Sequence, residues 1–389
     1  MHAHAELISA GGIFLLLFIS AFLLGRIGIP NIIAFMFAGL LSSQFMPEDI
    51  GDSLKVFEIS AVILLFFFIG LEFSFEKLSR LTQTIKPGLL DFFLNFPPIF
   101  GLSYIMTKDL IISLVLACAA YPTSTAITSK LLIDYKRIAS KEAEVIIGIL
   151  IFEDLISILL MSTLTGIVMH REIKEEGIFR GILSTILVFL IFYLLKKPVE
   201  NSLERLEKDI ENSLVPFMVL GFLLVSAGAG LKLGLSDALI SFMLGVLVPE
   251  KSWLYQSIER SLSDLKDLST GVFFFMFTFN AQIGQSFDIA IFLVITLASL
   301  ILKAISSFLG GISIGLGKRV SARIGLSMMQ RGEFSVLFAS LYEPSQELVF
   351  MLVLITAIVG SVCFVYAPKL IDRILPSRFR GKPPPTRTA

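Results

Sequence analysis

Residues 147–166 read IGILIFEDLISILLMSTLTG, and Glu153 and Asp154 are the only ionisable side chains in this run. A helix needs about 20 mostly apolar residues to cross the hydrocarbon core of a bilayer, so the run is long enough to span a membrane. A charged side chain at the bilayer centre costs about 2.5–3.5 kcal/mol on insertion scales. Because two adjacent carboxylates carry that cost, the stretch predicts a membrane helix with a functional site near its middle.

The composition of the whole chain agrees with a membrane protein. Of the 389 residues, 55% are apolar and 16% are charged, whereas soluble proteins carry about 25% charged residues. Lys+Arg and Asp+Glu are balanced at 32 each, so no net charge points to a nucleic acid partner. These figures exclude a disordered chain, a nucleic-acid-binding protein and an ordinary cytosolic globular protein. Cys118 and Cys363 lie in apolar stretches and predict neither a disulfide nor a zinc site.

Long apolar runs recur along the chain and predict an all-α polytopic membrane protein. The runs are continuous rather than alternating, which favours helices over a β-barrel. We predict thirteen membrane helices, at residues 8–25, 31–46, 53–72, 87–107, 109–131, 142–169, 178–195, 212–230, 235–250, 268–284, 286–310, 321–341 and 346–367.

The loop charges predict the orientation of these helices. Of the 32 Lys and Arg residues, 24 fall on the side that would hold the C-terminus and 6 on the opposite side. The remaining 2, Lys303 and Arg331, lie inside helical runs. Because cytoplasmic loops carry the excess of Lys and Arg, we expect a multi-pass plasma-membrane protein with its N-terminus outside and its C-terminus in the cytoplasm.

Polar residues interrupt two of the predicted helices. Residues 119–126 read AAYPTSTA, and Pro122 removes a helical hydrogen bond there; residues 330–335 read QRGEFS. Each interruption lies in the middle helix of a three-helix bundle, 87–169 or 286–367, and the two bundles enter the membrane from opposite sides. The pattern predicts inverted repeats with crossed broken helices, as in many secondary transporters. A Pro kink without function is the alternative for the first interruption.

The chain divides accordingly into five segments. They are N-terminal helices at 1–86, mostly dimerisation or scaffold, a first core bundle at 87–169, linker and scaffold helices at 170–285, a second core bundle at 286–367, and a cytoplasmic tail at 368–389. The tail is basic and Pro-rich and is expected to be disordered.

Lys303 also lies in the middle of an apolar run. An unpaired buried ammonium tends to lose its proton, so Lys303 is expected to pair with Glu153 or Asp154. Snorkelling of the lysine to an interface is the alternative. The two carboxylates would bind a proton or a metal cation, the alternative being a structural ion pair that joins two helices.

The order of several motifs resembles the monovalent cation/proton antiporters of the second cation–proton-antiporter class. This group includes bacterial and archaeal sodium/proton antiporters and the membrane domains of potassium-efflux systems. The resemblance covers nearly the whole chain. The similar features are FFIGLE at 67–72, TSTA at 123–126, FEDLISI at 152–158, GLSDALISFMLGVLV at 234–248, FFFMFTFNAQIG at 273–284, the buried Lys303 and GEFSVLF at 332–338.

The resemblance implies a sodium/proton antiporter fold with a six-helix core domain that moves against a dimerisation domain in a homodimer. It also implies that Asp154 is the main carrier of cation and proton. The position of Glu153 is Asp in electrogenic sodium members, Asn in electroneutral members and Gln in potassium-efflux members. Glu keeps the charge, and together with Lys303 it favours electrogenic exchange. The lack of a nucleotide-binding regulatory domain in the sequence favours Na⁺ over K⁺.

We therefore expect exchange of Na⁺, or else of K⁺ or Li⁺, for H⁺ by alternating access, with no resident cofactor. Asp154 would bind a Na⁺ ion or a proton, never both. Thr123, Ser124 and Thr125 would complete an oxygen shell, since hard cations bind oxygen ligands. Lys303 would pair with the neighbouring acid, Glu153, when the site holds no cation.

Two alternatives compete with antiport. A sodium-coupled organic-anion symporter could use Arg331 as the partner of the anion. Whether Arg331 and Glu333 contact the site or only support the core is left open. An intramembrane enzyme is disfavoured, because no HExxH motif and no Ser–His arrangement occurs in the sequence.

Overall fold

The computed structural model describes residues 2–26, 29, 31–45, 50–72, 84–170, 175–206, 210–232, 235–250, 252–280 and 288–374. Within these ranges, all regular secondary structure is helical. The helices are α1 (His2–Gly25), α2 (Asn31–Ser42), α3 (Ile50–Glu72), α5 (Ile85–Thr107), α6 (Leu110–Ala120), α7 (Thr125–Asp134), α8 (Lys141–His170), α9 (Glu175–Leu206), α10 (Val215–Lys232), α11 (Asp237–Val246), α12 (Trp253–Asn280), α13 (Ile289–Ser313), α14 (Lys318–Ser327), α15 (Glu333–Ser340) and α16 (Gln346–Ile374), with short 3-10 helices at Asn212–Leu214 and Glu343–Ser345.

The thirteen predicted spans fall on these helices in chain order. Two spans are divided into pairs, α6 with α7 and α14 with α15. By length and composition alone, seven helical segments of the described chain could cross a bilayer, and α2, part of α3 and α11 are shorter apolar helices. The prediction of an all-α polytopic membrane protein is confirmed.

Three helices extend well beyond the predicted spans. α12 begins 15 residues early, because its first turns are amphipathic and bury Leu254, Ile258 and Leu262 at four-residue spacing. α9 continues past Pro198 to Leu206, beyond the predicted end of its span at residue 195. α16 runs on to Ile374, where Asp372 pairs with Arg319 and Arg323 of α14 at 2.6 and 2.8 Å. Apolar length alone does not detect such amphipathic extensions.

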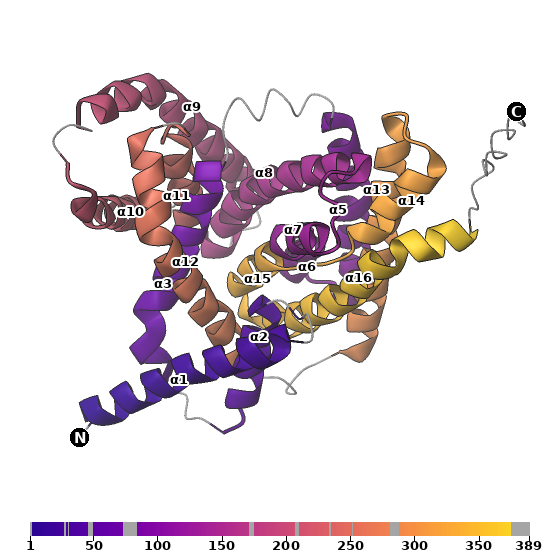
Figure 1. The fold of residues 1–389 in the computed structure, drawn as a ribbon, viewed down its shortest axis with the longest axis horizontal. Helices are drawn as coiled ribbons and strands as arrows, with labels where there is room; N and C mark the ends of the chain where they lie inside the picture. Colours follow the sequence, from indigo (N-terminus) through magenta and orange to yellow (C-terminus); the bar gives the residue numbers. More distant parts are fainter. Residues whose placement is uncertain are drawn as a thin grey trace, which may run out of the picture.

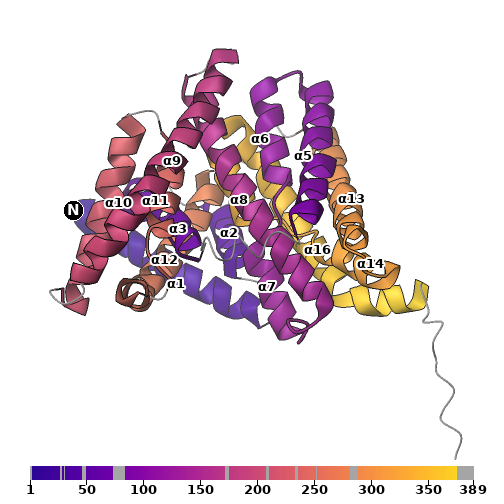
Figure 2. The same ribbon diagram turned by 90° about the horizontal axis from the view of Figure 1, so that it is seen from above.

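The helices form two groups that lie side by side. In Figure 1, α1, α3 and α9–α12 lie to the left, and α5–α8, α13, α14 and α16 lie to the right. Figure 2 shows the same separation from above. The largest contacts of α3 are with α11 and α12, and those of α5 are with α13 and α6. Both predicted three-helix bundles therefore lie in one group, with α5 packed along α13.

Glycine permits one close crossing in the first group. A Cβ atom at Gly70 of α3 would collide with the backbone of Phe242, and one at Gly245 of α11 would collide with that of Phe67. Close approach of backbones through small residues is a common way of packing helices in membranes, where lipid tails supply no hydrophobic drive between helices.

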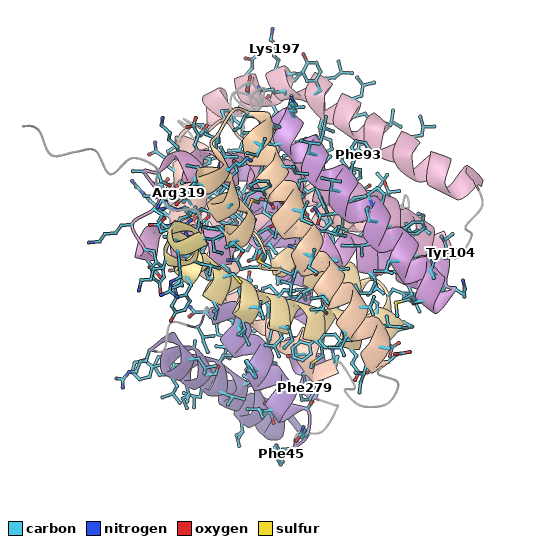
Figure 3. All side chains as sticks on the ribbon, turned by 90° about the vertical axis from the view of Figure 1, so that its right-hand side faces the viewer. Phe45, Phe93, Tyr104, Lys197, Phe279 and Arg319 are labelled. Atoms are coloured by element: carbon cyan, nitrogen blue, oxygen red, sulfur yellow. The ribbon has the colours of Figure 1, made fainter. Side chains whose placement is uncertain are left out.

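The outward face of α5, in the second group, carries large apolar side chains. Figure 3 shows Phe93 and Tyr104 projecting from α5, and they are 61% and 44% exposed. Large apolar side chains on an outward face fit contact with lipid rather than with water. Of the predicted cytoplasmic tail, residues 375–389 lie outside the described residues.

Candidate functional site

The two broken helices meet where each is interrupted. α6 ends at Ala120 and α7 begins at Thr125, and α14 ends at Ser327 and α15 begins at Glu333. Figure 1 shows α6, α7 and α15 converging beside α8. The predicted interruptions are therefore confirmed as true helix breaks.

Backbone and side-chain hydrogen bonds join the two breaks. The amide nitrogen of Ser124 donates to the carbonyl oxygen of Gln330 at 2.8 Å. The hydroxyl of Thr123 donates to the carbonyl oxygen of Met328 at 3.1 Å. These bonds satisfy backbone groups that the breaks release, which is how non-helical backbone is tolerated at membrane depth.

The two acids of α8 contact different residues of the first break. The Thr125 hydroxyl lies 3.1 and 3.3 Å from the two carboxylate oxygens of Asp154. Glu153 accepts a hydrogen bond from the backbone amide of Thr123, whose hydroxyl lies 3.4 Å from the other oxygen. Glu153 is fully buried and Asp154 is half-buried. The adjacent acids therefore differ in their access to the surroundings.

Lys303 of α13 pairs with two carboxylates. Its Nζ lies 3.0 Å from Oε1 of Glu153, as expected, and 2.7 Å from Oδ2 of Asp91 on α5. The Lys303 ammonium lies 5.0 Å from the centre of the Tyr121 ring. All three charged side chains are completely buried, so the lysine does not snorkel to an interface.

Asp91 is the residue of the site that the sequence analysis missed. Its second oxygen, Oδ1, accepts hydrogen bonds from the Ser306 hydroxyl at 2.6 Å and the Asn95 amide at 3.1 Å. The Asn95 amide also donates to the Ser306 hydroxyl at 2.8 Å. The signal was available, because Asp91 lies in the apolar run LLDFFLNF just as Glu153 lies in its own.

Glu333 and Arg331 both touch the core. Glu333 accepts hydrogen bonds from the Ser124 hydroxyl at 2.9 Å and from the Ala126 amide at 3.4 Å, at the N-terminus of α7. Arg331 is completely buried and donates to the carbonyl oxygen of Ser299 on α13 at 3.2 Å. Glu333 therefore contacts the first break directly, whereas Arg331 ties the second break to α13.

The three hydroxyl residues that the sequence grouped together have different partners. The Ser124 hydroxyl bonds Glu333 and caps α7 through the amide of Ile127. The Thr123 hydroxyl lies between Glu153 and Met328, and Thr125 is the member that bonds Asp154. The described residues hold no cluster of three or more His, Cys, Asp or Glu side chains that could bind a resident metal ion.

The amino-acid sequence matches a known family over most of its length. The sequence profile of the family described as "Sodium/hydrogen exchanger, transmembrane" matches residues 13–367. The chain belongs to this family.

Relatives of known activity extend along almost the full chain of this exchanger. The Ammonium/H(+) antiporter subunit AmhT of Alkalihalophilus pseudofirmus is 31% identical over 381 residues, which cover 95% of each chain. The K(+)/H(+) antiporter subunit KhtU of Bacillus subtilis is 26% identical and covers 89% of this chain and 86% of its own. The Na(+)/H(+) antiporter of Enterococcus hirae is 25% identical, with 82% and 85% covered.

The fold of this exchanger also matches a solved structure. The sodium proton antiporter MjNhaP1 from Methanocaldococcus jannaschii superposes with a TM-score of 0.68 at 16% identity, over 96% of this chain and 100% of that one. The exchanger is thus a multi-pass membrane protein and a monovalent cation/proton antiporter. The symporter and enzyme alternatives are set aside.

Proposed function

We propose that exchange takes place at Asp154, which binds either one monovalent cation or one proton. The observation that carries this proposal is the half-buried Asp154 carboxylate at the crossing of the two breaks, with the Thr125 hydroxyl 3.1 Å away. A carboxylate and a hydroxyl are oxygen ligands of the kind that hard cations prefer. One negative charge in a poorly solvated site cannot compensate two positive ones, so cation and proton compete for it.

The competition gives obligatory exchange. With either the cation or the proton bound, the carboxylate of Asp154 is neutralised, so moving the core across the low-dielectric barrier costs less free energy. We propose that α5–α8 and α13–α16 move as this core against α1–α3 and α10–α12. The separation of the helices into two groups supports this assignment (Figure 1).

The preferred cation is proposed to be K⁺ or NH₄⁺ rather than Na⁺. AmhT and KhtU are named for ammonium and potassium, and each matches this chain over more than four-fifths of its length. These names weigh against the sodium preference drawn from the sequence. Na⁺ is the competing candidate, favoured by the name of the Enterococcus hirae relative. Carboxylate and hydroxyl oxygens suit all three ions, since they can accept the hydrogen bonds of NH₄⁺ and coordinate a metal ion.

Proton flux into liposomes tests the proposal. Purified protein in liposomes that enclose a pH-sensitive dye is given outward gradients of K⁺, NH₄⁺, Na⁺ or Li⁺ in separate runs, with protein-free liposomes as the control for passive NH₃ leakage. We expect K⁺ and NH₄⁺ to drive faster proton movement than Na⁺, and Asp154→Asn to abolish it. Full exchange by Asp154→Asn would contradict the site, and faster exchange with Na⁺ would contradict the ion preference.

Exchange is proposed to be electrogenic. Because one cation exchanged for one proton at Asp154 moves no net charge, electrogenic exchange requires a second proton for each cation, which we assign to the neighbouring Glu153 carboxylate, 3.0 Å from the Lys303 ammonium. Each net charge moved couples to roughly 2.3 kcal/mol per 100 mV of membrane potential. Currents recorded on a solid-supported membrane after a cation jump should therefore be transient and carry net charge. Proton flux without any such current would show electroneutral exchange.

We further propose an N-terminus outside the cell and a homodimer held by the scaffold helices. An impermeant maleimide applied to intact cells should label Lys108→Cys and leave Lys141→Cys unlabelled. Both positions are exposed, and the single span formed by α6 and α7 lies between them, so they face opposite sides of the membrane. The reverse pattern would invert the topology. Native mass spectrometry should show the dimer mass, and a monomer alone would contradict the assembly.

A further inference from the structure

The Asp91–Lys303 pair has no role in the exchange cycle described so far. Lys303 has two carboxylate partners, and the cycle requires only one of them, Glu153. The second partner comes from a different element, since Asp91 lies on α5 and Glu153 lies on α8. A duplicated counter-ion in a fully buried site calls for a physical explanation, because every buried charge has a desolvation cost.

The two carboxylates are held in different ways. Asp91 is anchored at both oxygens, by Lys303 at 2.7 Å on one side and by Ser306 and Asn95 at 2.6 and 3.1 Å on the other. Asp91 and Asn95 lie on α5, and Lys303 and Ser306 lie on α13. The pair and its supports therefore belong to a single helix–helix contact.

Glu153 is shared between the lysine and the first break. Its Oε1 lies 3.0 Å from Lys303 and 3.4 Å from the Thr123 hydroxyl, and its Oε2 accepts from the Thr123 amide. Because its position depends on that break, Glu153 can turn toward a cation when the break rearranges. Such a turn would leave Lys303 uncompensated if the lysine had no other partner.

We propose that Asp91 is the permanent counter-ion of Lys303, a positioning residue that keeps the ammonium compensated so that Glu153 is free to leave it. The inference rests on the proposed exchange at Asp154 and its neighbour Glu153. It assigns Asp91 to the exchange machinery although Asp91 is not part of the cation site proposed at Asp154. Without the Asp91 charge, Glu153 is locked on Lys303, and a cation must compete with the ammonium for it.

The test separates the charge of Asp91 from its hydrogen bonds. In liposomes, Asp91→Asn should raise the cation concentration that gives the half-maximal rate at least about tenfold. This is the loss of affinity expected when a charged hydrogen-bond partner is removed. The maximal rate should fall much less, since a saturating cation still displaces the lysine. Ser306→Ala and Asn95→Ala keep the charge and each remove one hydrogen bond to the Asp91 carboxylate, so they serve as matched controls with little shift.

A double variant keeps the inference falsifiable. Asp91 acts through Lys303, so the additional Asp91→Asn change should leave the half-maximal concentration of Lys303→Met unaltered. This comparison also applies if Asp91→Asn alone does not fold, which thermal unfolding in detergent reports. An equal shift for Asp91→Asn and Ser306→Ala, or a further shift in the Lys303→Met background, would overturn the inference.

The result is distinguishable from a failure of the proposed function. A wild-type protein without exchange, or an Asp154→Asn variant with full exchange, contradicts the proposed function. Unchanged kinetics of Asp91→Asn, in a protein that Asp154→Asn inactivates, contradicts only the role of Asp91.

Discussion

The amide nitrogen of Ser124 donates a hydrogen bond to the carbonyl oxygen of Gln330 at 2.8 Å, which joins the two broken helices where they cross. Residues 206 positions apart in sequence are thereby locked backbone to backbone. Because the carbonyl and amide groups at both breaks have lost their helical partners, this bond and the Thr123–Met328 bond stabilise the crossing. Changes that separate the two backbones should therefore impair both folding and exchange.

Gly332→Ala tests the tightness of the crossing. A Cβ atom at this position would collide with the side chain of Ser124. Overpacking of this kind costs about 1–3 kcal/mol, so we expect a lower unfolding temperature in detergent and a reduced exchange rate. Gly221→Ala on α10 is the matched control, because nothing lies within 4 Å of its added Cβ. Equal unfolding temperatures and exchange rates of the two variants would show that the crossing accommodates an added methyl group.

Thr125→Val tests the hydroxyl beside Asp154. Valine keeps the shape of threonine and removes the oxygen that lies 3.1 Å from the carboxylate. A hydrogen bond to a charged group contributes about 1.5–3 kcal/mol, so the half-maximal cation concentration should rise by roughly tenfold or more. The measurement is proton flux at a series of cation concentrations.

The control for that variant lies one turn further along the same helix. Thr128 is completely buried, and its hydroxyl has no hydrogen-bond partner within the described chain. Thr128→Val should therefore leave the cation dependence unchanged. A shift as large as that of Thr125→Val would mean that loss of any hydroxyl on α7 disturbs the core, and the ligand role of Thr125 would be refuted.

Arg137→Lys is expected to reduce stability without changing cation affinity. The guanidinium of Arg137 binds Glu142 at 2.7 Å, Ser327 at 2.9 Å and the carbonyl oxygen of Phe364 at 3.0 Å. Lysine cannot reproduce this planar set of donors. Because these bonds tie the α7–α8 loop to α14 and α16, we expect a loss of about 1–3 kcal/mol.

An exposed arginine provides the comparison for Arg137. Arg319 pairs with Asp372 on the surface, at 34% and 48% side-chain exposure. Exposed ion pairs contribute about 0–1 kcal/mol, so Arg319→Lys should leave the unfolding temperature nearly unaltered. If Arg137→Lys unfolds at the wild-type temperature, or shifts the half-maximal cation concentration, its assignment as a purely structural tie is wrong.

The sequence predicted the parts of the site that stand out individually. Glu153, Lys303 and the Pro122 break are costly inside an apolar helix, and each lies in the core as expected. The partnerships were harder to predict, because Asp91 and Lys303 are 212 residues apart and no local pattern shows that α5 packs on α13. Which acid each hydroxyl residue of the first break contacts depends on the direction of the backbone there, and composition does not encode that direction. Amphipathic extensions such as the start of α12 also escaped a criterion based on apolar length.

The pH dependence of cation affinity is the most direct test of one shared site. If a proton and a cation compete for the single Asp154 carboxylate, each proton bound excludes one cation. In the pH range where the Asp154 carboxylate is mostly protonated, the half-maximal cation concentration should rise at least about tenfold for each unit of pH decrease, by mass action. Thr125→Val weakens cation binding, so it should raise the half-maximal cation concentration at every pH without changing the factor by which that concentration rises for each unit of pH. The measurement is cation-driven proton flux at fixed pH steps, with equal pH on both sides at the start. A half-maximal concentration that stays constant across pH, with only the maximal rate changing, would show that proton and cation occupy separate groups.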